Sequence, residues 1–260
     1  MARTSGAEAR AVRVARLQEL VEADGPLPLK RAAQVLDVTE MTIRRDLAGG
    51  DSPLSCLGGY VLAATLPAGE KYSLDEASDQ HAANKRLACE RAARTVRDGD
   101  CVFIDCGTTL VHLAEALPAE LSLSVVCYSM NIAQIVSRRP RTQLMMMGGL
   151  YHGSSATFFS DEGLAWLERL GINKAFISAG GVHPQRGASC SNFHEVPVKQ
   201  AVVRSAAESV LVVDESKLGR VRPAFFASLE PFSQIVVGGA PSPEAKRQFK
   251  GLPLEIVRGA

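Results

Sequence analysis

Apolar residues in the first part of the chain recur at helical spacing. A stripe that includes Leu17 and Val21 predicts a helix over about residues 8 to 23, and Asp24-Gly25-Pro26 ends it because proline cannot continue a helix. A second short helix is predicted over LKRAAQVL, from Leu29 to Leu36, and the tight turn Asp37-Val38-Thr39 follows it.

A third helix is predicted in TEMTIRRDL, residues 39 to 47. Thr39 suits its capping position, and Glu40 places a carboxylate at the positive end of the helix dipole. Ile43 and Leu47 are four residues apart, so they share one side and are predicted to face the core. The side chains predicted to point away from the core are those of Thr42, Arg44 and Arg45.

A short apolar hairpin is predicted after these helices. In LSCLGGYVLAAT two short strands flank Gly58-Gly59, a pair that suits a tight turn. A helix, a tight turn and a second helix with outward basic and hydroxyl side chains form a helix-turn-helix, whose second helix fits the major groove of DNA. The hairpin would then be a wing beside that motif.

Beyond residue 80, near-continuous apolar runs alternate with amphipathic segments. Strands are predicted at about 101–105, 123–127, 143–147, 174–178, 210–213 and 234–238, and helices at about 80–97, 108–117, 131–138, 160–170 and 195–209. This alternation is typical of an α/β fold with a mostly parallel sheet. Within the third strand, Met145–Met147 are predicted to fill the core.

Composition narrows the class of protein. Of 260 residues 46% are apolar, and no apolar run approaches the ~20 residues of a membrane helix. We divide the chain into a winged helix-turn-helix domain at 1–66, a linker at 67–79 and an α/β domain at 80–260. Six cysteines without C-x-x-C spacing and an N-terminus without a secretory signal lead us to expect a cytoplasmic protein with free thiols.

Net charge does not decide whether the chain binds nucleic acid. The whole chain has a formal charge of +1, and its first 66 residues carry eight basic and eight acidic side chains. Long-range electrostatic attraction to DNA is therefore weak, and the case for DNA binding depends on where Arg44 and Arg45 lie.

Polar residues gather where the predicted strands end, the edge at which parallel sheets bind ligands. The first strand runs into Asp105-Cys106-Gly107-Thr108-Thr109, which opens a helix and offers donors for a phosphate. The third ends in Gly148-Gly149, the fourth in Ala179-Gly180-Gly181, and the fifth in Asp214-Glu215-Ser216-Lys217, with Arg220 and Arg222 close behind. Asp105, Asp214 and Glu195 could accept hydrogen bonds from sugar hydroxyls, so the set favours a phosphorylated polyol.

Other chemistries find less support in the sequence. The five histidines have no H-x-x-x-H spacing, and no G-x-S-x-G or G-x-x-x-x-G-K-[ST] motif occurs. We therefore expect no metal, no cofactor, no catalytic nucleophile and no nucleotide P-loop.

These motifs resemble those of the DeoR family of bacterial sugar-metabolism repressors. LDVTEMTIRRDL followed by LGGYV is similar to that family's winged helix-turn-helix, and the remainder resembles its sensor domain, which is related in fold to ribose-phosphate isomerases. DCGTT, CYSMN, AGGVHPQRGASC, HEVPVK and VVDESKLGRVRPA resemble its deoxyribose subgroup more closely. The family at large usually has Thr-Asn-Ser where this chain has Cys127-Tyr128-Ser129.

The resemblance implies a repressor of nucleoside and deoxyribose catabolism genes. Its inducer would be deoxyribose-5-phosphate, which would bind the sensor domain and release operator DNA, and a homo-oligomer would bind repeated half-sites. The implied DNA-binding residues are Thr42, Arg44, Arg45, Gly58, Gly59 and Tyr60. The implied effector-binding residues are Asp105, Gly107, Thr108, Thr109, Tyr128, Gly148, Gly149, Glu195, Asp214 and Lys217.

Two alternatives stay open at this point. The same kind of repressor could respond to another sugar phosphate. The chain could also be a sugar-phosphate isomerase, with Asp105, Glu195 and Lys217 transferring protons, but that hypothesis leaves the winged helix-turn-helix unexplained. The sequence does not say which arginine contacts bases and which contacts phosphate.

Overall fold

The computed structural model describes residues 6–24, 27–48, 52–57, 60–63 and 81–259. The chain divides into two compact units, Met1–Lys71 and Tyr72–Ala260. This division falls within the predicted linker at 67–79, which lies outside the described residues. The exact bounds of the two domains and of the linker therefore stay a prediction.

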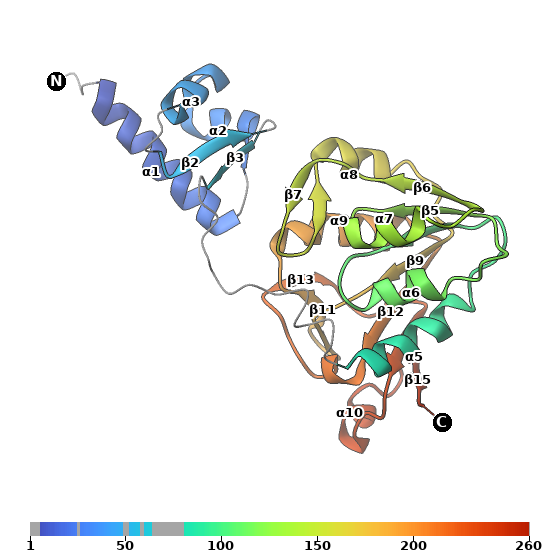
Figure 1. The fold of residues 1–260 in the computed structure, drawn as a ribbon. Helices are drawn as coiled ribbons and strands as arrows, with labels where there is room; N and C mark the ends of the chain where they lie inside the picture. Colours follow the sequence, from blue (N-terminus) through green and yellow to red (C-terminus); the bar gives the residue numbers. More distant parts are fainter. Residues whose placement is uncertain (1–5, 25–26, 49–51, 58–59, 64–80, 260) are drawn as a thin grey trace. The chain divides into compact units, whose positions relative to one another are not determined.

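The described part of the first unit combines three helices with a small antiparallel sheet (Figure 1). Its elements are α1 (Gly6–Asp24), β1 (Leu27–Pro28), α2 (Leu29–Leu36), α3 (Glu40–Leu47), β2 (Leu54–Leu57) and β3 (Tyr60–Ala63). Strand β3 lies between β1 and β2. The three predicted helices and the hairpin are confirmed, although the turn at Gly58-Gly59 lies outside the described residues.

Local hydrogen bonds set the turn between α2 and α3. Asp37 ends α2 in the left-handed conformation at φ 50°, and the N–H of Val38 donates to the carbonyl of Ala33 at 3.0 Å. Thr39 then caps α3, because its Oγ1 accepts a hydrogen bond from the N–H of Thr42 at 3.2 Å. The two helices therefore meet at a fixed angle over a core formed by Leu17, Leu29, Ala32, Ile43 and Val61, among others.

A parallel sheet of seven strands forms the centre of the second unit. Its strand order is β15-β14-β12-β9-β4-β5-β6, and each neighbouring pair is parallel. The strands are β4 (Cys101–Ile104), β5 (Leu123–Cys127), β6 (Thr142–Met146), β9 (Lys174–Ile177), β12 (Glu208–Asp214), β14 (Gln234–Gly238) and β15 (Leu254–Val257). The α/β class and the six predicted strands are confirmed, whereas β15 was not predicted.

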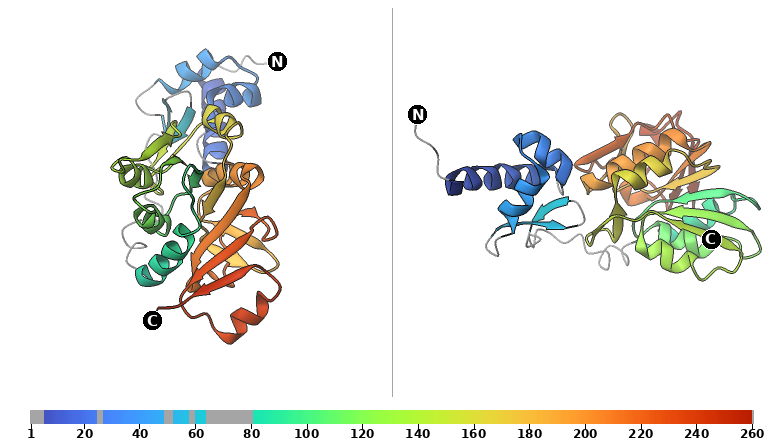
Figure 2. Two further views of the ribbon diagram at one scale, coloured as in Figure 1. Left: turned by 90° about the vertical axis from the view of Figure 1, so that its right-hand side faces the viewer. Right: turned by 90° about the horizontal axis from the view of Figure 1, so that it is seen from above.

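Helices cover both faces of this sheet. They are α5 (Ala82–Ala93), α6 (Leu110–Ala116), α7 (Met130–Val136), α8 (Asp161–Leu167), α9 (Val196–Ser205) and α10 (Pro243–Gln248). The green helices α5 to α7 lie together on one side in both views of Figure 2. Side chains of β4 alternate between the faces, so Val102 and Ile104 pack with α5 to α7 while Phe103 packs with α8 and α9.

Short antiparallel strands, which the sequence did not predict, stand outside the main sheet. They are β7 (Leu150–His152) with β8 (Thr157–Phe159), and β10 (Gly181–His183) with β11 (Gly187–Cys190) and β13 (Ala224–Ala227). Two single-turn helices, η1 (Phe193–Glu195) and η2 (Glu215–Lys217), follow β11 and β12. None of the helices in the described ranges is both long and apolar enough to cross a membrane.

The prediction that Met145–Met147 all fill the core was wrong for Met146. Met147 is buried at 2% exposure, but Met146 is 38% exposed. Strand β6 is the last strand at its end of the sheet, so it has a neighbour on one side only. Hydrophobicity alone does not distinguish an edge strand from a central one.

Candidate DNA-contacting helix and effector site

Helix α3 presents its basic side chains to solvent. Ile43, Asp46 and Leu47 are buried, whereas Arg44 and Arg45 are exposed and have no ion-pair partner among the described residues. The predicted division of this helix into inward and outward sides is therefore confirmed. It leaves two guanidinium groups free to bind an external partner.

In the first turn of α3, the neighbouring side chains of Met41 and Thr42 differ in exposure. Thr42 is half-buried, and its hydroxyl lies 2.9 Å from that of Thr39. Met41 is 71% exposed although its side chain is large and apolar. The sequence prediction omitted Met41 because, on this helix, it selected only basic and hydroxyl side chains.

Asp46 connects α3 to α1 and was also missed. Both carboxylate oxygens accept hydrogen bonds from Arg13, from Nε at 2.6 Å and from Nη2 at 3.1 Å. Arg10 Nε donates to the backbone carbonyl of Asp46 at 2.8 Å. The hydrogen bond and charge of Asp46 raise the pKa of Arg13 despite its partial burial. This bidentate pair fixes α3 against α1.

The predicted wing contacts are only partly described. Gly58 and Gly59 lie outside the described residues. Tyr60 is 9% exposed, but it is not part of the apolar core of the first unit, which its strand neighbour Val61 enters. A DNA contact by Tyr60 stays a prediction.

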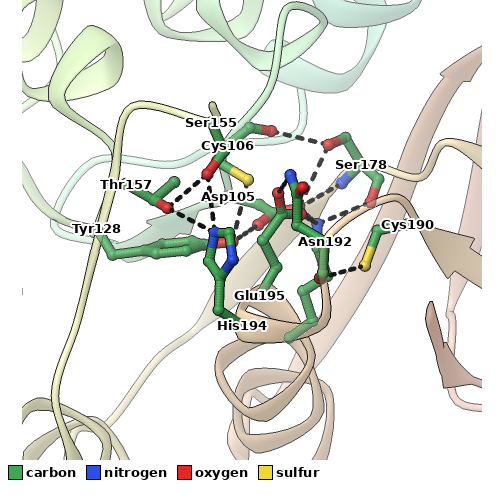
Figure 3. A network of polar contacts seen from close by, with 11 residues as sticks. Asp105, Cys106, Tyr128, Ser155, Thr157, Ser178, Cys190, Asn192, His194 and Glu195 are labelled. Atoms are coloured by element: carbon green, nitrogen blue, oxygen red, sulfur yellow. Dashed lines mark hydrogen bonds and ion pairs between the residues drawn. The ribbon is translucent and has the colours of Figure 1, made fainter. Parts of the chain in front are cut away.

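In the second unit, Asp105 is the centre of a buried polar network at the carboxyl ends of β4 and β9 (Figure 3). Its Oδ1 accepts a hydrogen bond from the hydroxyl of Tyr128 at 2.6 Å. Its Oδ2 accepts from the N–H of Ser178 at 2.9 Å and from the ammonium group of Lys199. Asp105 is completely buried, and protein groups donate hydrogen bonds to both of its carboxylate oxygens.

Lys199 joins this carboxylate to a second one. Its ammonium group lies 3.6 Å from Glu195 Oε2, and the amide of Asn192 donates to Glu195 Oε1 at 2.7 Å. Burial alone would lower the pKa of Lys199, but the charge of Asp105 raises it well above its ordinary value. Lys199 therefore stays protonated between two carboxylates.

The β7–β8 hairpin supplies another wall of the network (Figure 3). His194 Nε2 lies 3.0 Å from the Ser155 hydroxyl and 3.4 Å from the Thr157 hydroxyl. His152 stacks on His194 with ring centroids 3.8 Å apart. Burial lowers the pKa of each of these histidines to about 4, so both rings are neutral at pH 7.

The remaining titratable groups of the network are uncharged at neutral pH. Burial, followed by the charge of Asp105, raises the pKa of Tyr128 well above its ordinary value. Burial raises the pKa of Cys190 to about 12 and that of Cys106 well above its ordinary value. These thiols are therefore not nucleophiles.

A second polar group lies at the carboxyl ends of β4 and β12. Lys85 is buried on α5 and donates from Nζ to the Thr108 hydroxyl at 3.0 Å. Lys217 Nζ lies 3.8 Å from Asp214 Oδ2, a fully buried oxygen without a hydrogen-bond partner in the described structure. Two lysines therefore lie at this edge of the sheet, one beside a hydroxyl group and the other beside a buried carboxylate.

Six of the ten predicted effector residues belong to one of these two polar groups. Asp105, Tyr128 and Glu195 belong to the first network, while Thr108, Asp214 and Lys217 belong to the second group. Gly107 connects them, with φ 98° and an ideal Cβ position 3.3 Å from Ser178 Oγ. Thr109 is buried and its carbonyl accepts from Cys89 Sγ, while Gly148 and Gly149 lie in the turn after β6.

Sequence reasoning missed several members of both groups. The largest omission is Lys199, followed by Lys85, Ser178, His194 and Asn192. One signal was available, because Glu195 and Lys199 are four residues apart in HEVPVK and can therefore pair on one helix face. No three His, Cys, Asp or Glu side chains within the described ranges are grouped so that they could hold a metal ion.

Comparisons with known proteins cover both units. A DeoR-like helix-turn-helix domain matches residues 13–52, and a DeoR C-terminal sensor domain matches residues 80–239. The deoxyribose operon repressor of Escherichia coli is 39% identical over 228 residues, which cover 88% of this chain and 90% of that protein. The HTH-type transcriptional regulator IolR of Bacillus subtilis is 26% identical over 225 residues, which cover 86% of this chain and 90% of that protein.

Among solved structures, ribose 5-phosphate isomerase A from Methanocaldococcus jannaschii has 18% identity and a TM-score of 0.41. The match covers 53% of this chain and 55% of that chain. At this distance the likeness gives no indication of activity.

Proposed function

The chain belongs to the DeoR family and is a DNA-binding transcriptional repressor; from this premise we propose that it represses genes of deoxyribose and nucleoside catabolism and leaves its operator when deoxyribose-5-phosphate binds. The observation behind the proposal is 39% identity, over nearly the full length, to a deoxyribose operon repressor. The matched relatives are transcriptional regulators, and the chain is not an enzyme.

The two polar groups of the sensor domain suit the two ends of a sugar phosphate. We assign the phosphate to the side of Lys85, Thr108 and Lys217, because ammonium and hydroxyl groups bind phosphate oxygens. The sugar hydroxyls would then lie toward Glu195 and Asn192, with Asp105 and Lys199 behind them. Strand β9 lies between β12 and β4, so one ligand at this edge could span both groups.

The buried charges favour ligand binding over catalysis at this site. Asp105 and Lys199 are fully paired with protein groups, and neither is placed to exchange a proton with a ligand in the described conformation. We therefore propose that they hold Tyr128, Ser178 and Glu195 in place as positioning residues. The ligand would then contact groups that have fewer hydrogen-bond partners within the protein, such as Lys217.

Release from DNA requires that the effector bind unequally to two states of the repressor. If deoxyribose-5-phosphate binds the DNA-free state more tightly by about 1–3 kcal/mol, operator affinity falls roughly 5- to 150-fold. A single helix-turn-helix contacts few base pairs, so we propose a homo-oligomer on repeated half-sites. A repressor acts on the chromosome, so we place it in the cytoplasm.

The test is a DNA-binding titration with the full chain. Operator DNA is first selected by the protein from a random duplex library, and its dissociation constant is then measured with deoxyribose-5-phosphate, ribose-5-phosphate, glucose-6-phosphate or inorganic phosphate. Deoxyribose-5-phosphate is expected to weaken binding most. Release by another of these compounds, with no response to deoxyribose-5-phosphate, would support the alternative that this repressor has a different effector.

A substitution then tests the assigned phosphate end. Lys217→Ala should keep its operator affinity but need at least tenfold more deoxyribose-5-phosphate for release, because Lys217 faces the assigned phosphate position. Lys250→Ala is the matched control, since Lys250 is an exposed lysine beyond α10. An unchanged response of Lys217→Ala would contradict this placement of the phosphate.

A further inference from the structure

Helix α3 has one line of side chains that faces directly away from its own domain. An α-helix turns by about 100° per residue, so Met41 and Arg45 each lie about 160° from the buried Ile43, one on either side of the opposite direction. Arg44 and Thr42 each lie about 100° from Ile43, on the two flanks. The outermost line therefore consists of one apolar and one cationic side chain, one helical turn apart.

Exposure and hydrogen bonding agree with this geometry. Met41 is 71% exposed and Arg45 is exposed, whereas Thr42 is half-buried with its hydroxyl beside that of Thr39. The buried pair of Asp46 with Arg13 fixes the rotation of α3 about its axis, because Asp46 lies on the inward side. The outward line is therefore a property of the folded unit as well as of an ideal helix.

A helix with its side chains is about 10–12 Å wide, and the major groove of B-DNA is about 12 Å wide. When such a helix enters the groove, its outermost line faces the base edges and its flanks face the two phosphate backbones. Residues in the N-terminal turn of a recognition helix contact bases, and Met41 is the second residue of α3. Arg45 lies one helical turn further along the same outward line.

On this geometry, which rests on the chain being a DNA-binding repressor, we propose that Met41 and Arg45 contact the bases and that Arg44 binds the phosphate backbone. Arg45 donates two hydrogen bonds to the O6 and N7 acceptors of one guanine. Met41 packs its thioether side chain against the 5-methyl group of a thymine one helical turn away. Arg44 on the flank neutralises a phosphate and contributes affinity without sequence preference.

Base analogues test the two assignments separately. In the duplex selected by the wild-type protein, each thymine is replaced in turn by deoxyuridine, which lacks the 5-methyl group, and each guanine by 7-deazaguanine, which lacks the N7 acceptor. Dissociation constants are measured without effector, so the result does not depend on the proposed inducer. Wild-type protein should lose a few-fold in affinity at one thymine per half-site and at least as much at one guanine, where the analogue removes one of the two acceptors that Arg45 uses.

Met41→Ala and Arg45→Ala should each lose sensitivity to one base analogue and keep sensitivity to the other. Met41→Ala should bind the deoxyuridine and thymine duplexes equally while staying sensitive to 7-deazaguanine, and Arg45→Ala should behave in the opposite way. Arg44→Ala should weaken binding to every duplex by a similar factor and reduce the slope of log affinity against log salt by about 1. All three side chains point to solvent, so these variants should fold, which circular dichroism can verify.

Val12→Ala is the matched control, because Val12 is 70% exposed but lies on α1. It should keep both analogue dependences. The proposal is overturned for Met41 if Met41→Ala still distinguishes thymine from deoxyuridine. It is overturned for the arginines if Arg44→Ala loses the 7-deazaguanine effect while Arg45→Ala changes the salt slope.

Discussion

At the residue scale, Asp46 has a packing role although it lies within TEMTIRRDL, the segment whose arginines are predicted to contact DNA. It follows Arg44 and Arg45 directly, yet it is 4% exposed and pairs with Arg13 across the first unit. The sequence predicted which side of α3 faces the core from its apolar residues. It did not predict that a carboxylate would share that side, because the partner is 33 residues away in sequence.

Asp46→Asn should destabilise the first unit by about 1–3 kcal/mol, because the half-buried guanidinium of Arg13 would lose its charged partner. Operator affinity should also fall, since this pair fixes α3 on α1. Thermal unfolding followed by circular dichroism measures the first effect, and a DNA titration measures the second.

The control for this prediction is Glu19→Gln, which removes an exposed pair with Arg16 whose side chains are 56% and 65% exposed. That change should stay within about 0.5 kcal/mol. If Asp46→Asn unfolds at the same temperature as the wild type, the link between α1 and α3 contributes nothing to stability.

The candidate effector site shows a different limit at the same scale. Asp105, Asp214 and Lys217 could be selected from sequence because they follow apolar strands at the edge where parallel sheets bind ligands. Lys199 and Lys85 lie within helices, where a lysine normally faces solvent. The spacing of Glu195 and Lys199 indicates an ion pair, but it does not show that the pair is buried. Only the packed structure shows that both are 2% exposed or less.

At the element scale, prediction succeeded for long, strongly patterned segments. The central strands of the parallel sheet, β5, β4, β9, β12 and β14, are buried on both faces and therefore appear as nearly continuous apolar runs. The strands β7, β8, β10, β11 and β13 were missed. Four of them, β7, β8, β10 and β11, mix apolar residues with polar residues or glycine, whereas β4, which also has four residues, is apolar throughout. They matter for function because the β7–β8 hairpin brings Ser155 and Thr157 to His194.

The turn between β6 and β7 offers a test of what holds that hairpin. Gly149 has φ 136°, and a Cβ there would lie 2.2 Å from the carbonyl oxygen of Phe159. Gly149→Ala should therefore destabilise the second unit by about 1–3 kcal/mol, as measured by chemical denaturation of the full chain.

Gly148→Ala is the control from the neighbouring residue. A Cβ at Gly148 would meet no atom within 4 Å, and its φ lies outside the left-handed range. This change should alter the free energy of unfolding by no more than about 1 kcal/mol, toward greater stability. Equal effects of the two substitutions would show that the backbone conformation and close packing of Gly149 do not determine the stability of the second unit.

At the scale of the whole molecule, the chain consists of two compact units with separate cores. Sequence analysis predicted both units and their order, because the spacing of apolar residues changes between them. It could not place the boundary residue by residue, since a segment of mixed polarity has no periodic signal of its own.

Separate cores lead us to expect two unfolding transitions with different responses to ligand. Deoxyribose-5-phosphate at 100 times its dissociation constant should stabilise the second unit by about 2.7 kcal/mol and leave the first nearly unchanged. Differential scanning calorimetry of the full chain measures both transitions, and hydrogen exchange assigns each to its unit. A single transition that shifts as a whole would instead show that the two units unfold cooperatively.

The saturation of Asp105 also has a consequence for calorimetry. Its oxygens already accept hydrogen bonds from Tyr128, Ser178 and Lys199, so a ligand hydroxyl that reaches this carboxylate must exchange one hydrogen bond for another. Such an exchange releases little heat. The binding enthalpy measured by titration calorimetry should therefore come mainly from the phosphate. Sugars should differ in enthalpy chiefly by how many of the protein hydrogen bonds that they displace are not replaced by bonds to the sugar.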